Sequence, residues 1–179
     1  NLKNVIISSK TNLIDIENVT IDRYSFNGCI NLECLNISSS KIEFKESWCG
    51  DIPNLKRIIV SPENKNYIYK DDEFLLGKTD EKSDNYDILL FSRRDIKKAI
   101  IPSNIKIISS YSFEQCVNLQ SIEFSSESEL TTIEAYAFSS TKIEHILIPQ
   151  HVTCIGEWAL YDGDFKTVEF SENLNNITL

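Results

Sequence analysis

The sequence contains no methionine, only two histidines, few glycines and prolines, and no long apolar run. Because a natural chain starts with methionine, we interpret residues 1–179 as one segment of a longer protein, with any signal peptide or anchor outside it. Five glycines and four prolines are too few for a disordered linker. No stretch approaches the roughly 20 apolar residues that a membrane-spanning helix needs. We therefore expect a folded segment without direct membrane insertion.

The two histidines, His145 and His151, belong to no recognisable catalytic pattern. The common nucleophile, phosphate-binding and zinc-protease motifs are missing from the sequence. Cys34 is expected to face outward as His145 does, but three strand steps separate them, or about 14–15 Å at a spacing of ~4.8 Å. That distance exceeds the reach of a nucleophile–base pair. We predict a non-enzymatic protein without a cofactor.

Charge and cysteine content exclude further classes of site. The net charge of −9 argues against nonspecific nucleic-acid binding. A polar stretch holds four acidic residues without the alternation and glycine of a calcium loop, which predicts a solvated loop and no metal site: Asp80, Glu81, Asp84 and Asp87. Five cysteines are odd in number and include no CxxC pair, which favours reduced thiols: Cys29, Cys34, Cys49, Cys116 and Cys154. Sequons at Asn18, Asn36 and Asn176 occur at the frequency expected by chance and leave glycosylation open.

One apolar pattern recurs along the chain. In Leu119-x-x-Ile122-x-Phe124, the fourth and sixth positions are apolar and the fifth is not, which is typical of a strand. Seven such blocks begin at Leu2, Leu32, Leu55, Ile96, Leu119, Ile143 and Phe165, and the last four are separated by 23, 24 and 22 residues. A period of this length predicts a solenoid, in which each repeat packs only against its neighbours.

A second short motif recurs between the blocks, as in Tyr111-Ser112-Phe113 and Tyr136-Ala137-Phe138. We expect it to return the chain along the side opposite the strands, with its large apolar residue buried between consecutive turns of the solenoid. Buried positions are predicted at Phe26, Phe113 and Phe138, with Trp48 and Leu160 in the equivalent places. Cys29 and Cys116 follow three residues after such a phenylalanine and are interpreted as small core-filling residues.

The run Ile101-Pro102-x-x-Ile105-x-x-Ile108-x-x-x-Ser112-Phe113-x-x-Cys116-x-x-Leu119-x-x-Ile122 resembles the BspA-type leucine-rich repeat of bacterial surface antigens and protozoan proteins. Val152-x-x-Ile155-Gly156-x-x-Ala159-Leu160 is similar, with leucine where the family prefers phenylalanine. The resemblance implies a leucine-rich-repeat solenoid with a curved parallel sheet on its concave side, and short strands and helical turns on its convex side. It also implies a cell-surface or extracellular location, although the cysteine usage leaves a cytoplasmic or cytoskeletal one open.

The regular spacing breaks between Leu55 and Ile96, which are 41 residues apart. Three short β-prone runs occupy the excess, at residues 67–69, 74–76 and 88–91, with polar stretches between them. This pattern predicts a β-hairpin-type insertion at about residues 62–92 on an otherwise single solenoid spanning 1–179. We expect the blocks at Leu55 and Ile96 to remain neighbours in the sheet.

Outward positions of those two blocks combine basic and apolar side chains. If the blocks are neighbours, they form a basic patch with an apolar centre: Lys56, Arg57, Ile59, Lys97, Lys98 and Ile100. We interpret this patch as a candidate contact for a protein or glycan partner on the concave sheet. The alternative is an ordinary charged face neutralised by neighbouring glutamates.

Two functions are compatible with these patterns. The first is a binding module that recognises a protein or glycan, because solenoids present extended surfaces. The second is a structural component that packs laterally in a surface or cytoskeletal assembly. Apolar residues at both ends lack a covering repeat in the sequence and predict self-association or fraying: Leu2, Val5, Ile7, Leu174 and Ile177.

Overall fold

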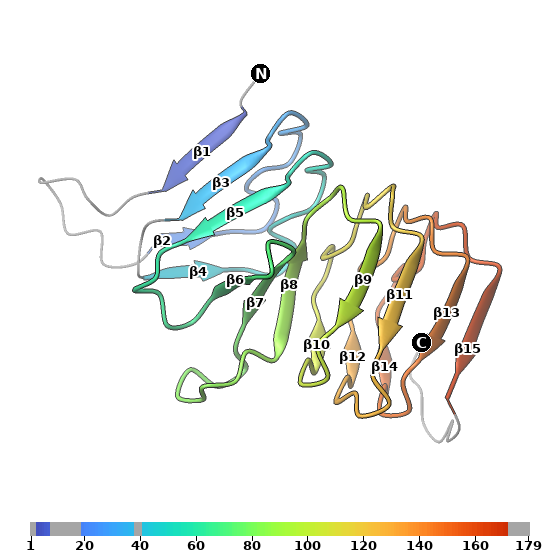
Figure 1. Cartoon of the computed structure of the whole chain (residues 1–179). Helices are drawn as coiled ribbons and strands as arrows, with labels where there is room; N and C mark the ends of the chain where they lie inside the picture. The colour runs from blue at the N-terminus through green and yellow to red at the C-terminus, as the bar shows by residue number, and fades with distance from the viewer. Residues whose placement is uncertain (1–2, 8–18, 38–40, 172–179) are drawn as a thin grey trace, which may run out of the picture.

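Two columns of parallel strands run side by side along the chain and are joined by turns (Figure 1). The computed structural model describes residues 3–7, 19–37 and 41–171, and within these ranges it contains no helix. Leu2, Asn18, Leu174, Asn176 and Ile177 lie outside the described residues.

The first column contains the predicted blocks. Its strands are β1 (Asn4–Ile7), β3 (Cys34–Ile37), β5 (Arg57–Val60), β9 (Lys98–Ile101), β11 (Ser121–Phe124), β13 (His145–Ile148) and β15 (Thr167–Phe170). Alternation of the apolar residues places Ala99 and Ile101 in the core while Ile100 stays exposed. Most neighbouring strands pair in register, for example Ile122 with Ala99, whereas β11 and β13 are in contact but belong to different sheets. The prediction of a leucine-rich-repeat solenoid is confirmed.

The second column follows the opposite side of the solenoid. Its parallel strands are β2 (Val19–Ile21), β4 (Ile42–Phe44), β8 (Ile88–Ser92), β10 (Ile107–Ile108), β12 (Thr132–Ile133) and β14 (Cys154–Ile155). Turns follow these strands where helical turns were expected. Tyr111, Tyr136 and Trp158 have φ values of 63°, 56° and 59°, and residues in this left-handed conformation cannot continue a right-handed helix. The convex side therefore consists of short strands and tight turns.

An antiparallel meander extends the second column between the two halves of the chain. β6 (Ile68–Lys70) pairs with β7 (Phe74–Gly77), which pairs with β8 across a bulge at Leu75 and Leu76. The side chains of β7 serve both halves of the core. Leu75 packs in the N-terminal cluster, whereas Phe74 and Leu76 pack in the C-terminal cluster. The meander thus joins the two cores.

The first column is interrupted between β5 and β9, so the prediction that these blocks pair is wrong. β5 ends a three-stranded sheet with β1 and β3, and β9 begins the next pair with β11 (Figure 1). One backbone hydrogen bond connects the start of the two blocks, from Arg94 N–H to the Leu55 oxygen at 3.0 Å. Beyond that bond, β6 lies beside β5. The meander thus occupies the space that β9 would need to pair with β5. We call this interruption the sheet break.

The turns bridge the sheet break that the strands leave open. Tyr24 and Tyr111, 87 residues apart, contact edge to face at 5.9 Å between ring centroids, and their hydroxyl groups are 3.1 Å apart. Tyr111 in turn stacks on Tyr136 at 4.9 Å. Gly50 permits the approach, because a Cβ there would lie 3.3 Å from the Tyr24 ring. The turns therefore connect the two halves on the convex side, although β4 and β8 belong to different sheets.

Burial of the recurring aromatic residues is confirmed for four of the five predicted positions. Phe113 and Phe138 are completely buried and stack at 5.1 Å, and Phe26 and Trp48 are also buried. Leu160 is only half-buried, and that prediction is wrong. It lies in the last described turn of the solenoid, where it packs against the rim of the core.

Asp87 corrects the prediction of a solvated acidic loop. Its side chain is buried, and its two carboxylate oxygens accept hydrogen bonds from the Thr79 N–H and hydroxyl groups at 2.8 and 2.7 Å. Lys106 approaches one oxygen at 3.2 Å. Burial opposes ionisation, but these hydrogen bonds and the lysine charge outweigh it, so the pKa of Asp87 is lowered. Asp87 therefore anchors the loop to the solenoid.

Candidate functional site

The six residues of the predicted patch are all exposed, but they lie on two separate sheet segments. Lys56, Arg57 and Ile59 belong to β5 and its approach, and Ile59 is 36% exposed. The other three, Lys97, Lys98 and Ile100, lie at β9 on the far side of the sheet break. The patch is therefore divided by the break and does not cover one continuous sheet.

The charges of the patch are unevenly neutralised. Lys98 forms an ion pair with Glu123 at 2.6 Å. This pair agrees with the alternative interpretation, in which neighbouring glutamates neutralise an ordinary charged face. Lys56, Arg57 and Lys97 form no ion pair within the part of the chain that the structure describes. Three cationic side chains on a protein of net charge −9 thus remain available beside the sheet break.

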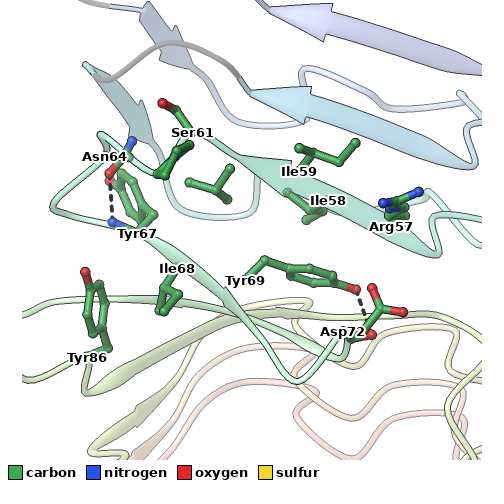
Figure 2. A pocket seen from close by; sticks show the side chains of 12 residues that line it. Arg57, Ile58, Ile59, Ser61, Asn64, Tyr67, Ile68, Tyr69, Asp72 and Tyr86 are labelled. Carbon is green, nitrogen blue, oxygen red and sulfur yellow. Dashed lines mark hydrogen bonds between the residues drawn. The ribbon is translucent and has the colours of Figure 1, made fainter.

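A pocket of about 410 Å³ opens along β5 on the side of β6 (Figure 2). Residues 57–62 form one wall, and Tyr67, Ile68 and Tyr69 form the other. Tyr86 and Asp72 complete the lining. The pocket includes Arg57 and Ile59 of the predicted patch, so it extends from the exposed face of β5 into the gap between β5 and β6.

Asn64 closes one end of the pocket and is held by its own loop. Its Oδ1 atom accepts hydrogen bonds from the N–H groups of Asn66 and Tyr67, both at 2.9 Å (Figure 2). These two donors require the oxygen at that position, which determines the orientation of the carboxamide. The side chain is 7% exposed, and its Nδ2 atom has no hydrogen-bond partner among the described residues.

Tyr69 closes the other end of the pocket. Its hydroxyl lies 3.3 Å from the Lys56 oxygen and 3.2 Å from the Asp72 oxygen, so one proton is shared between two carbonyl acceptors. Burial, with a smaller contribution from the Asp72 charge, raises the pKa of Tyr69 well above its usual range. Tyr69 therefore stays protonated and holds β6 against the start of β5.

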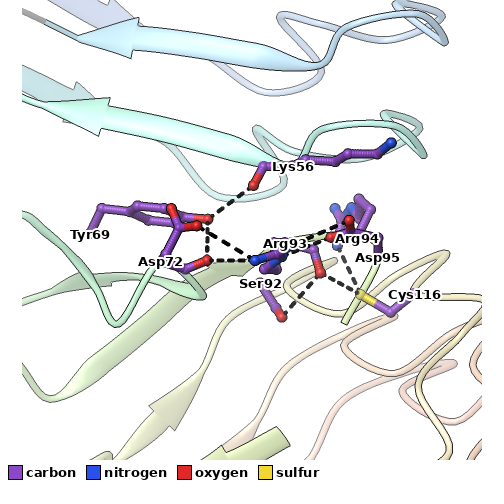
Figure 3. A network of polar contacts seen from close by, with 8 residues as sticks. All are labelled: Lys56, Tyr69, Asp72, Ser92, Arg93, Arg94, Asp95 and Cys116. Atoms are coloured by element: carbon purple, nitrogen blue, oxygen red, sulfur yellow. Dashed lines mark hydrogen bonds and ion pairs between the residues drawn. The ribbon is translucent and has the colours of Figure 1, made fainter. Parts of the chain in front are cut away.

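An arginine pair fixes the corner behind Tyr69 (Figure 3). Arg93 binds Asp95 through two hydrogen bonds of 2.7 and 3.1 Å and lies 3.6 Å from the Asp72 carboxylate. Its hydrogen bond lowers the pKa of Asp95. Arg94 is buried and donates to the Cys49, Tyr111 and Ser112 oxygens at 2.9 to 3.1 Å. Cys49 lies in one turn and the adjacent residues Tyr111 and Ser112 lie in another, so Arg94 joins the two halves of the chain. Through Asp72, this corner is joined to the lining of the pocket.

The other chemically active side chains do not converge. Within residues 3–7, 19–37 and 41–171, no three histidine, cysteine or acidic side chains are grouped to hold a metal ion. His145 contacts the Thr167 hydroxyl at 2.7 Å. Cys49 is completely buried, and burial raises its pKa to about 11, which keeps the thiol protonated. No helix of the described part is long and apolar enough to cross a membrane.

Sequence reasoning identified Arg57 and Ile59 but not the pocket that they line. Asn64 and Asp72 lie in polar stretches of the expected insertion, and a buried carboxamide has no sequence signal that distinguishes it from an exposed one. The run at residues 67–69 did predict a short strand, and β6 occupies residues 68–70. Alternation along a strand places Tyr67 and Tyr69 on one face. What that face packs against depends on where β6 docks.

Comparison with protein families matches the chain to the family described as the BspA type leucine rich repeat region, in six copies over residues 1–73 and 88–179. Residues 74–87, which hold β7 and the following loop, lie outside the match. A comparison with curated proteins found no match.

A comparison with solved structures found similar proteins. A leucine-rich repeat protein from Eubacterium ventriosum has 30% identity and a TM-score of 0.72, with 85% of this chain and 39% of that chain covered. A leucine rich cell surface protein from Faecalibacterium prausnitzii has 15% identity and a TM-score of 0.43, over 96% of this chain and 44% of that chain. The pneumococcal vaccine antigen PcpA has 14% identity and a TM-score of 0.48, over 97% and 55%.

The chain thus spans between about two fifths and just over half of the length of these three proteins. Three observations agree with one another: the repeated strand blocks, the stacked and buried Phe113 and Phe138, and the family match over residues 1–73 and 88–179. The chain belongs to the BspA-type leucine-rich repeat family.

Proposed function

We propose that the chain is a non-catalytic recognition module that binds a protein or glycan partner through the face of its first strand column beside the sheet break. The observation that carries the proposal is the presence of three cations without an ion-pair partner among the described residues, next to two exposed isoleucines. Basic groups steer an acidic partner, and apolar side chains supply the desolvated centre of an interface. The three cations are Lys56, Arg57 and Lys97.

We further propose a cell-surface or extracellular location for the longer protein. The support is the resemblance of the repeats to those of bacterial surface antigens. Free cysteines fit either compartment, because Cys49 and Cys116 are buried. Cys154 is exposed and is the thiol that an oxidising environment would reach first.

Charge reversal tests the proposed site. The variant carries Lys56→Glu, Arg57→Glu and Lys97→Glu, and its binding to an array of purified extracellular matrix proteins and acidic glycans is measured by biolayer interferometry. We expect a reduced association rate, with a difference from wild type that shrinks at high salt because screening weakens steering. Ile59→Asp should instead raise the dissociation rate.

A matched variant reverses Lys142 and Lys166, which pair with Asp164 and Glu144 at 3.0 and 2.8 Å, away from the sheet break. This control should leave the association rate unchanged. If an array component binds wild type and the triple reversal variant equally well at low salt, the proposed site is wrong.

A further inference from the structure

β5 has a free edge on the side of the sheet break. The N–H groups of Arg57 and Ser61 donate to the β3 side, to the Glu33 and Ile37 oxygens at 3.2 and 2.8 Å. Backbone groups of alternate residues in a strand point to opposite edges, so those of Ile58 and Val60 face away from β3. No described strand pairs with that edge.

The pocket lies along this free edge. Ile58, Val60 and Ser61 line it together with Tyr67 and Tyr69 (Figure 2). A row of unpaired N–H and C=O groups is a template for an added strand, which is one of the recurring ways in which proteins recognise peptides. In a continuous sheet such an edge belongs at the two ends, whereas β5 presents one inside the array, beside the meander.

Asn64 supplies an independent indication of a ligand. Its Nδ2 atom is a donor on a 93% buried side chain that lines the pocket, and its orientation is determined by the two N–H groups that Oδ1 accepts. A buried donor without a partner is unfavourable unless something supplies an acceptor. A backbone carbonyl of a bound chain would supply one.

Charge and spacing select the kind of ligand. Arg57 lines the pocket and Lys56 lies beside it, and neither forms an ion pair within the described ranges. Asp72 also lines this end but is paired with Arg93, so Arg57 and Lys56 are left to attract an acidic side chain. The free edge presents N–H and C=O groups of every second residue at the regular rise of about 3.3 Å per residue. An extended peptide matches that repeat, whereas a sugar ring does not.

We propose that the free edge of β5 binds an extended peptide segment of a partner protein by strand addition, with an acidic side chain directed to Arg57 and a backbone carbonyl to Asn64 Nδ2. This inference rests on the proposed function and specifies the chemistry of its partner. The edge of β5 supplies the backbone hydrogen bonds, and Tyr67, Tyr69 and Ile59 supply the walls.

The probe is a positional-scanning library of acetylated hexapeptide amides, followed by amide chemical shifts of the isotope-labelled protein. At about 1 mM peptide, which detects Kd values up to about the same concentration, we expect peptides with a central glutamate among β-branched residues to shift Ile58, Val60 and the Asn64 side-chain amide. The same peptide methylated on alternate backbone nitrogens, and an acidic disaccharide, should leave these signals unmoved.

Three substitutions separate strand addition from simple charge attraction. Val60→Pro removes an outward N–H without removing a bond to β3, since proline is tolerated at sheet edges, while Val60→Thr keeps the N–H and the branched side chain. Asn64→Asp keeps the oxygen that the loop requires and removes the Nδ2 donor. We expect Val60→Thr to bind as wild type, and Val60→Pro and Asn64→Asp to bind at least about tenfold more weakly, or about 1.4 kcal/mol.

The outcomes distinguish this inference from the function on which it rests. If no library peptide shifts Ile58, Val60 or Asn64 while charge reversal still weakens binding to an array component, strand addition is wrong and the recognition module stands. Equal binding of the methylated peptide, or shifts caused by the disaccharide alone, also overturns strand addition. Should Val60→Pro lose its dispersed spectrum, Asn64→Asp and the methylated peptide still decide the question.

Discussion

At the scale of single residues, stability is concentrated in the stacked phenylalanines of the turns. Phe113 and Phe138 are fully buried and lie at equivalent positions of consecutive repeats, so each ring packs between its neighbours. The backbone also links consecutive repeats at these residues. The Phe113 N–H donates to the Ala137 oxygen and the Phe138 N–H donates to the Ala159 oxygen, both at 2.8 Å. Side chain and turn therefore reinforce one another.

Phe138→Ala tests this packing. Truncation of a buried phenylalanine removes its transfer free energy and leaves a cavity, so we expect a loss of about 3–5 kcal/mol in the free energy of unfolding. Chemical denaturation monitored by circular dichroism measures it. Val117→Ala, at a side chain that is 54% exposed, should change stability by less than about 0.5 kcal/mol. A loss below about 1 kcal/mol for Phe138→Ala would contradict the packing role.

Asp87 gives the loop before β8 a pH-dependent attachment. Its pKa is lowered from the ordinary value of 3.8, so folding favours the ionised carboxylate. The stabilisation is fully present above the unfolded-state pKa and is lost as pH falls through the lower folded-state pKa. Asp87→Asn removes the partner of Lys106 and the acceptor of the Thr79 hydroxyl, and we expect a loss of about 1–3 kcal/mol at pH 7.

The measurement is denaturant unfolding of wild type and Asp87→Asn between pH 7 and pH 3. The difference between them should be largest at neutral pH and should shrink below about pH 4. Asp84→Asn, at an exposed position of the same loop, is the control and should follow wild type throughout. A difference independent of pH would show that the carboxylate charge is not the stabilising feature.

At the scale of elements, the close approach of consecutive turns depends on Gly156. Its N–H donates to the Ile133 oxygen at 2.7 Å, and a Cβ at this position would lie 2.4 Å from the Ala135 nitrogen and 2.6 Å from the Glu134 carbonyl carbon. Backbone atoms cannot move aside as side chains do. The glycine therefore sets the distance between β12 and β14.

We expect Gly156→Ala to destabilise the protein by about 1–3 kcal/mol, the usual result of forcing atoms into a packed site. Thermal and denaturant unfolding measure the loss. Thr153→Ala, on an exposed side chain just before β14, should stay within about 0.5 kcal/mol of wild type. Equal stability of both variants would mean that the neighbouring turn shifts freely.

At the scale of the whole molecule, the strands at the two ends of the first column differ from those inside it. Val168 occupies the block position that is buried in preceding repeats, yet it is 37% exposed, compared with 2% for Ile146 and 8% for Ile122. β15 pairs with β13 and β1 pairs with β3, and no described strand of the first column lies beyond β15 or β1. Exposed edges of this kind favour association.

We expect the isolated chain to self-associate through these strands, which would appear as a sedimentation coefficient that rises with protein concentration. Val168→Lys places a charge on the exposed face and should reduce the rise. Leu147→Lys, at an exposed position on the opposite face of the neighbouring strand, is the matched control. A concentration-independent sedimentation coefficient for wild type would contradict the prediction.

Local patterns in the sequence determined the repeated part of this fold. Each block of the Leu119 type specifies its own strand, and the alternation of its apolar residues specifies which side chains enter the core. Burial of Phe113 and Phe138 also follows from the repeat, because each packs only against adjacent turns. Leu160 departs from the pattern and is only half-buried against the rim of the core.

Only the tertiary structure decided the course of residues 61–96. Pairing of β5 with β9 depends on where β6 and β7 dock, and that is set by contacts between residues far apart in sequence, such as Arg94 with Cys49 and Tyr69 with Lys56. No periodic pattern encodes such contacts. The same docking leaves β5 with a free edge and buries Asn64. The sequence by itself therefore determined that Arg57 and Ile59 are exposed. The pocket that they line arises from the packing of the meander.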